Sequence, residues 1–203
     1  MAQDPNIARL LEHPAIWRGR SANAQAQGLA TGFAALDERL PGRGWPRSGL
    51  IEILVSRFGS GELSVLLPGL AALTRAAAAR WCVWVAPPLM PFAPALAASG
   101  VVLDRVAVVG GARALWAFEQ TLGSGACDAV LAWARAPRPR DIRRLQLAAE
   151  RGRTLGVLFR PRCAAGESSS ALLRLALEPA AGGVRITLLK ARGARCAAFC
   201  LDL

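Results

Sequence analysis

The chain has 203 residues and a formal net charge of +11, with 25 lysine and arginine residues against 14 acidic ones. Its apolar content of 53% and mean hydropathy of +0.32 exclude an intrinsically disordered chain and indicate a single domain with a sizeable core. No apolar run reaches the ~18 residues of a membrane-spanning helix, and the N-terminus lacks the basic and apolar regions of a signal peptide. We therefore expect a cytoplasmic protein without a membrane partner.

Residues 1–27 are predicted to form an N-terminal arm and linker, separate from one domain over residues 28–203. Apolar side chains recur near helical spacing at 5–19, and a polar stretch follows at 21–27. An aromatic side chain among arginines outside a core is typical of an interface anchor. We therefore expect this arm to bind a partner through Trp17, Arg18 and Arg20.

From residue 28 onward the apolar pattern predicts an α/β domain. A short helix is expected over 31–40 with Thr31 as a candidate N-cap. Strands are then predicted at 50–55, 81–86, 105–109, 128–133 and 154–159, with helices at about 61–79, 91–99, 112–123 and 139–151. This alternation favours a mostly parallel sheet flanked by helices. The strand-like stretches at 171–177, 183–190 and 196–202 predict a C-terminal antiparallel β extension.

Residues 50–64 have the outline of a phosphate-binding loop without its chemistry. A loop of the G-x-x-x-x-G-K-[ST] type holds phosphates with backbone N–H groups and a lysine, and holds Mg²⁺ with a hydroxyl. Here Glu62 and Leu63 follow Gly61, and Val55 or Ser56 stands at the leading glycine. Like charges about 4 Å apart repel by roughly 4 kcal/mol at an effective dielectric of about 20, so a carboxylate here opposes nucleotide binding. We expect no cofactor at this degenerate loop, which comprises Ser56, Gly59, Gly61, Glu62 and Leu63.

Residues 135–144 are rich in arginine and are predicted to form a proline-bearing turn that leads into a helix. The candidates for phosphate contact with DNA are Arg138, Arg140, Arg143 and Arg144. The alternative is a solvated first helical turn, since arginine-rich usage is also what a GC-rich genome imposes. Residues 160–170 are expected to form a flexible loop, and the alternative, a second DNA-contact loop, ranks lower because the segment is short.

The five cysteines show no framework spacing. Cys82 and Cys127 lie in apolar strand patterns and are expected to be buried and reduced. Cys196 and Cys200 form a lone C-x₃-C motif far from His13, so we expect no metal site.

The order of motifs resembles the RecA-type recombinase core over roughly residues 28–195. The matching strings are T-G-x-x-x-L-D from Thr31 and G-x-G-x-P-x-x-G-L-I-E-I from Gly42. The resemblance implies a RecA-like core, but the catalytic positions differ. Where RecA-type ATPases place a water-activating acid, a Mg²⁺ aspartate and a γ-phosphate-sensing glutamine, this chain has Ala86–Pro88, Ala132–Ala134 and Arg160–Pro161. Phosphoryl transfer depends on positioning and charge stabilisation, so we expect no enzyme activity.

The strings G-W-P-R-S-G-L-I-E-I, V-A-P-P-x-x-P-x-A-P-A-L and L-G-x-L-F-R-P resemble the ImuA family more closely. That resemblance implies a non-catalytic accessory protein of SOS-induced translesion DNA synthesis. Its partners would be an ImuB-type inactive polymerase homologue and RecA, with an error-prone replicative-type polymerase in the same complex. Direct DNA contact stays open.

Two alternatives remain. The first is a SulA-like inhibitor of the division protein FtsZ, which ranks lower because SulA-type chains lack the extended loop lead-in and closing hairpin that this chain keeps. Filamentation on overexpression, independent of ImuB, would favour it. The second is a RecA-type ATPase with an unorthodox loop, which phosphate release above background would reveal.

Overall fold

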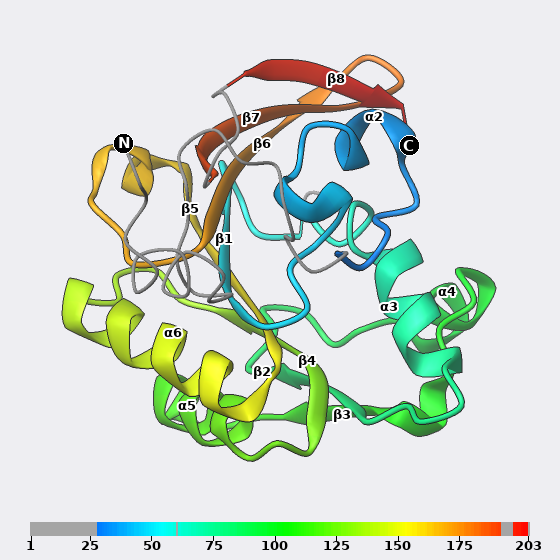
Figure 1. Cartoon of the computed structure of the whole chain (residues 1–203), viewed down its shortest axis with the longest axis vertical. Coiled ribbons are helices and arrows are strands. Elements are labelled where there is room, and N and C mark those ends of the chain that lie inside the picture. The colour runs from blue at the N-terminus through cyan, green and yellow to red at the C-terminus, as the bar shows by residue number, and fades with distance from the viewer. Residues whose placement is uncertain (1–27, 60, 192–196, 203) are drawn as a thin grey trace, which may run out of the picture.

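Eight strands form one sheet in the order β3-β2-β4-β5-β1-β6-β7-β8 (Figure 1). The computed structural model describes residues 28–59, 61–191 and 197–202. The strands are β1 (Gly49–Val55), β2 (Trp81–Val85), β3 (Val106–Val109), β4 (Cys127–Trp133), β5 (Leu155–Pro161), β6 (Leu173–Ala180), β7 (Gly183–Ala191) and β8 (Ala198–Asp202). Strands β1 to β6 pair in parallel, and β7 and β8 extend the sheet antiparallel. The predicted α/β class with an antiparallel C-terminal part is confirmed.

Helices cover both faces of the parallel part. The helices are α2 (Ala34–Asp37), α3 (Leu67–Arg75), α4 (Ala93–Ala98), α5 (Ala114–Gly123) and α6 (Pro139–Gly152), with 3₁₀ turns η1 (Pro41–Arg43), η2 (Leu103–Arg105) and η3 (Arg162–Gly166). Helices α5 and α6 lie on one face, and α3 and α4 lie on the other (Figure 1). Because both faces are covered, every residue of β1 is buried, which explains why the strand is apolar apart from Glu52.

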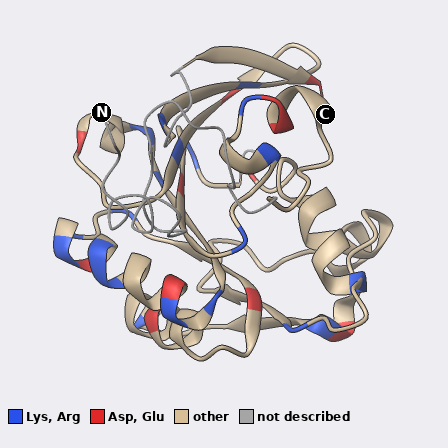
Figure 2. Cartoon of the chain, in the orientation of Figure 1, with Lys and Arg blue, Asp and Glu red and all other residues tan. Residues whose placement is uncertain are grey.

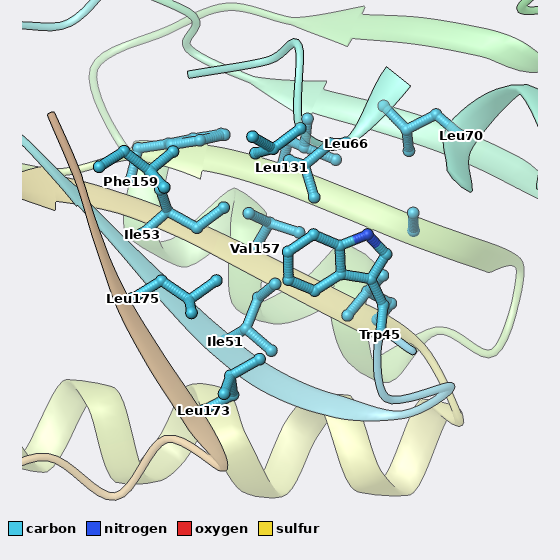
Figure 3. Packing of buried hydrophobic residues seen from close by; sticks show 14 of the residues in the cluster. Trp45, Ile51, Ile53, Leu66, Leu70, Leu131, Val157, Phe159, Leu173 and Leu175 are labelled. Carbon is cyan, nitrogen blue, oxygen red and sulfur yellow. The ribbon is translucent and has the colours of Figure 1, made fainter. Parts of the chain in front are cut away.

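The larger apolar core lies on the face of the sheet that α3 covers. Trp45 is fully buried there and packs over side chains of β1 and β5, including Ile51 and Val157 (Figure 3). Trp45 and Leu29 also form an antiparallel bridge. The indole of Trp133 stacks on Phe159 with ring centroids 4.8 Å apart. The lead-in to β1 is therefore part of the core.

Two local predictions are wrong. Helix α3 begins only at Leu67, because residues 62–66 form turns and Pro68 occupies the first helical turn, where a proline lacking N–H is best accommodated. Thr31 does not cap α2, whose N-cap is Phe33. The Thr31 hydroxyl instead accepts the Phe33 N–H at 3.1 Å in a buried turn.

The cysteines differ sharply in environment, which predicts their reactivity. Burial raises the pKa of Cys82 to about 12 and also raises the pKa of Cys127, whereas Cys163 and Cys200 are exposed. A neutral, buried thiol is a poor nucleophile. At pH 8 we expect iodoacetamide to alkylate Cys163 and Cys200 and to spare Cys82 and Cys127 until denaturant is added, as read by mass spectrometry.

The same shift has a consequence at alkaline pH. Up to the ordinary thiol pKa of 9.0, Cys82 is protonated in both the folded and the unfolded state. Above that pH the unfolded state loses the proton first, so the contribution of Cys82 to stability falls as the pH rises toward about 12. Rapid labelling of Cys82 in the native protein at pH 8 would contradict the assigned burial.

None of the helices in the described ranges has the length and apolar character needed to span a bilayer.

Candidate functional site

Three segments meet at the carboxyl end of the parallel sheet. They are the degenerate loop after β1, residues 86–92 after β2 and residues 134–138 after β4. A Cβ atom added to Gly59 would lie 3.1 Å from Cδ1 of Leu89, so the first two segments touch. The guanidinium of Arg135 lies 5.6 Å from the ring centre of Phe58, which joins the third segment to the first. Ligand sites of α/β sheets form at this end of the strands.

In the degenerate loop, the carboxylate of Glu62 accepts hydrogen bonds from the protein itself. Glu62 is only 4% exposed, and its Oε1 accepts the Gly59 N–H at 2.8 Å and the Trp133 indole N–H at 3.2 Å. In a phosphate loop, backbone N–H groups would point at the bound anion. Here one of them donates to Glu62 instead, so an anion added from outside would meet a negative charge already in place.

Trp133 ends β4, where the sequence lacks the expected aspartate. The sequence shows the substitutions at positions 62 and 133 as two separate losses, but in the structure they form one contact. A buried carboxylate needs donors, and the indole N–H supplies one without adding charge. The loop also differs from a phosphate loop in its geometry. Because α3 starts at Leu67, no helix N-terminus follows Gly61 directly to bind a phosphate. Both differences oppose nucleotide binding.

The segment after β2 exposes three large apolar side chains. Leu89, Met90 and Phe92 are 68%, 79% and 71% exposed. Ala86, which precedes Pro87, has φ +46°, a left-handed conformation that non-glycine residues rarely adopt. Such strain is found most often at functional sites. The sequence analysis used this segment only as a family string and assigned it no binding role, although large apolar residues in a proline-rich loop, where polar residues are usual, were a signal.

A buried ion cluster lies beneath the same end of the sheet. Glu52 of β1 is fully buried and bonds Arg160 of β5 at 2.8 Å and Arg174 of β6 at 2.6 Å. Burial lowers the pKa of Arg160, but hydrogen bonds to Glu167 and Glu52 outweigh that effect and raise the pKa above its ordinary value. The guanidinium is therefore charged in the folded protein.

Arg174 ties this cluster to η3. Its guanidinium donates to the carbonyls of Ala164 at 2.8 Å and Glu167 at 2.7 Å. Arg160 also bonds the Glu167 carboxylate at 2.6 Å. The expectation of a flexible loop over 160–170 is therefore wrong, because buried arginines hold that segment to the sheet.

The DNA-contact candidates gather on the first turns of α6 and are exposed (Figure 2). Arg144 bonds Glu119 at 2.6 Å, and Arg140 lies 4.0 Å from Asp141. Asp141 also accepts the backbone N–H of Arg138 at 3.0 Å. These acids balance part of the charge, so the patch is less basic than the sequence pattern indicates, and Arg138, Arg140, Arg143 and Arg144 stay predictions.

Trp17, Arg18 and Arg20 lie outside the described residues, as does Cys196. Within the described segments, no group of three or more histidine, cysteine, aspartate or glutamate side chains is placed to hold a metal ion.

Comparison with known proteins identifies the family. No family model matches the chain. A cell division inhibitor SulA from Photorhabdus laumondii is 34% identical over 96 residues, 46% of this chain and 54% of that protein. A cell division inhibitor SulA from Edwardsiella piscicida is 33% identical over 119 residues, 57% of this chain and 70% of that protein. The chain belongs to the SulA family.

This SulA-family chain spans about half the length of the first relative and 70% of the second. The crystal structure of SulA from Pseudomonas aeruginosa aligns with 55% of this chain and 97% of its own length, at 23% identity and a TM-score of 0.46.

The assignment to the ImuA family is wrong, because both curated relatives are SulA proteins. The predicted role in translesion synthesis is wrong for the same reason. The predicted partners, an ImuB-type polymerase, RecA and an error-prone polymerase, are wrong as well. Of the three strings that suggested ImuA, the first ends inside the buried strand β1, at residues 49–53, and the third is the buried strand β5. The second covers residues 85–96, most of which follow β2. Packing between two helical layers restricts such strands to similar residues in related folds, so they distinguish families poorly.

Proposed function

We propose that this chain is a non-enzymatic inhibitor of cell division that binds FtsZ and acts in the SOS response to DNA damage. Membership of the SulA family carries this proposal, since both curated relatives are named cell division inhibitors. It is also the alternative that the sequence left open.

The site supports inhibition by binding and not by catalysis. Glu62 places a carboxylate among the donors of the degenerate loop, and Trp133 stands where a metal-binding acid would be needed. The position of the loop, directly after the central parallel strand β1, supports a RecA-like core that has lost its nucleotide chemistry. What remains at this end of the sheet is a set of exposed side chains suited to contact with another protein.

Assembly of FtsZ tests the function directly. We expect the purified chain to suppress the GTP-dependent assembly of FtsZ from the organism that carries it, at concentrations close to that of FtsZ, as followed by light scattering and sedimentation. Lysozyme, a basic protein of another fold, is the control for a non-specific effect of the +11 charge. Unchanged assembly at a tenfold excess of the chain would contradict the proposal.

A further inference from the structure

We propose that Leu89, Met90 and Phe92, together with Phe58 and Arg135, form the surface that docks onto FtsZ. This inference rests on the proposed function and assigns it a place on the molecule. It commits to one partner, a protein surface with an apolar depression rimmed by carboxylates.

The apolar part of this docking surface is unusual for its exposure. Among the large apolar side chains of the described residues, Met90 and Phe92 keep the largest fractions of their surface in water, at 79% and 71%. Large apolar side chains that lie exposed next to one another on a protein surface are costly in water and mark sites that another molecule covers. Aromatic and methionine side chains are also the types enriched at interface centres.

The segment is held in place before any partner arrives. Prolines at positions 87, 88, 91 and 94 restrict its backbone, and the Ala86 N–H donates to the Val109 carbonyl at 2.7 Å, which fixes the point where the chain leaves β2. Leu89 rests against Gly59 of the degenerate loop, and that loop is held by Glu62. A preordered loop loses little conformational entropy on binding, so its apolar contacts contribute more fully to affinity.

The charge beside the apolar side chains selects the partner. Arg135 is exposed and lies over the ring of the half-buried Phe58, which precedes the Gly59 that Leu89 contacts. Its positive charge therefore belongs to the same group of contacts as the apolar segment. The chain as a whole carries +11. An acidic partner surface would be attracted at long range and aligned by Arg135 at short range. A second copy of this basic chain would be repelled, which disfavours self-association through this surface.

Paired substitutions test the assignment with a matched control. Met90→Ser with Phe92→Ser removes two exposed apolar side chains from the docking surface, whereas Trp116→Ser with Leu147→Ser removes two from α5 and α6, where they are 53% and 55% exposed. We expect the first pair to raise the half-inhibitory concentration against FtsZ assembly by at least about 30-fold and the second by less than about 3-fold. The first pair should keep the wild-type melting temperature, and the second should lower it slightly because Trp116 and Leu147 are only about half exposed.

Arg135→Glu tests the electrostatic half. We expect a rise of roughly 10-fold in the half-inhibitory concentration at low salt that shrinks as ionic strength increases.

Failure of the wild-type chain to inhibit would reject the proposed function itself. Wild-type inhibition that Met90→Ser with Phe92→Ser leaves unchanged would reject the docking surface alone. Loss of a homodimer in that pair, with inhibition intact, would likewise reject it and assign the surface to a second copy.

Discussion

Replacing Glu52 with alanine is expected to lower the free energy of unfolding by about 3–5 kcal/mol. Glu52 is fully buried and bonds two arginines that are 1% and 6% exposed at their side chains. Without the carboxylate, the two buried guanidiniums would lose the anion between them: Arg160 would keep Glu167 at 2.6 Å, and Arg174 would keep carbonyl acceptors. Since small domains are stable by only about 5–15 kcal/mol, this single change would remove a large part of the total.

Glu167→Ala is the matched control for this prediction. Glu167 bonds the same Arg160 at 2.6 Å, but its side chain is 53% exposed, so water compensates for its loss. We expect a cost of no more than about 1 kcal/mol for that variant. Urea unfolding with linear extrapolation would measure both. If Glu52→Ala cost no more than Glu167→Ala, the buried cluster would not be the stabilising element inferred here. Glu52→Gln keeps the shape without the charge and provides a measurable variant if Glu52→Ala does not fold.

Replacing Glu62 with alanine is expected to lower the free energy of unfolding by about 2–3 kcal/mol, because the Trp133 indole N–H and the Gly59 N–H lose a charged acceptor. Glu62→Gln keeps an acceptor oxygen and should cost about 1 kcal/mol. The loop that supports Leu89 would loosen in the alanine variant, so inhibition of FtsZ should weaken as well.

A nucleotide-binding measurement distinguishes the structural role proposed for Glu62 from a role of the loop in ATP hydrolysis. Equilibrium dialysis with labelled ATP and Mg²⁺ should show no saturable binding to the wild-type chain up to millimolar concentrations. The Glu62→Ala variant should also fail to bind, because it still lacks the lysine and the helix N-terminus that a phosphate loop requires. Saturable binding by the wild-type chain would overturn the non-enzymatic interpretation.

The secondary structure could be predicted because it depends on local periodicity. Buried strands such as β4 and β5 appear as short apolar runs. In α6 the apolar residues recur at helical spacing and form one face, with the charged residues on the other. The start of α3 was not predictable in this way, since the apolar run from Leu63 continues through the turns that precede the helix. Pro68 was the available signal for a later start.

The ion cluster could not be predicted because its members are far apart in sequence. Glu52 is separated from Arg160 by 108 positions and from Arg174 by 122. Each is a single charge inside an apolar run, and a buried charge requires a partner of opposite sign. The sequence therefore contained a reason to expect a partner but not its identity.

The docking surface was missed for a different reason. Exposure depends on what the rest of the fold leaves uncovered, and Leu89, Met90 and Phe92 stand at the unspecified positions of the string over residues 85–96. The family was missed partly because two of the three strings used to assign it reach into buried strands, where packing and not the partner selects the residues.

The carboxylate of Glu62 has a consequence for how a cell could regulate this protein. A ligand shifts a protein between states only if it binds one state better than another. If the loop binds no nucleotide, as we propose, cellular ATP would have no state to favour, and the energy status of the cell would not be communicated to the rest of the molecule. Inhibition of division would then follow the number of copies present, so that transcription and proteolysis, and not metabolite levels, set when it begins and when it ends.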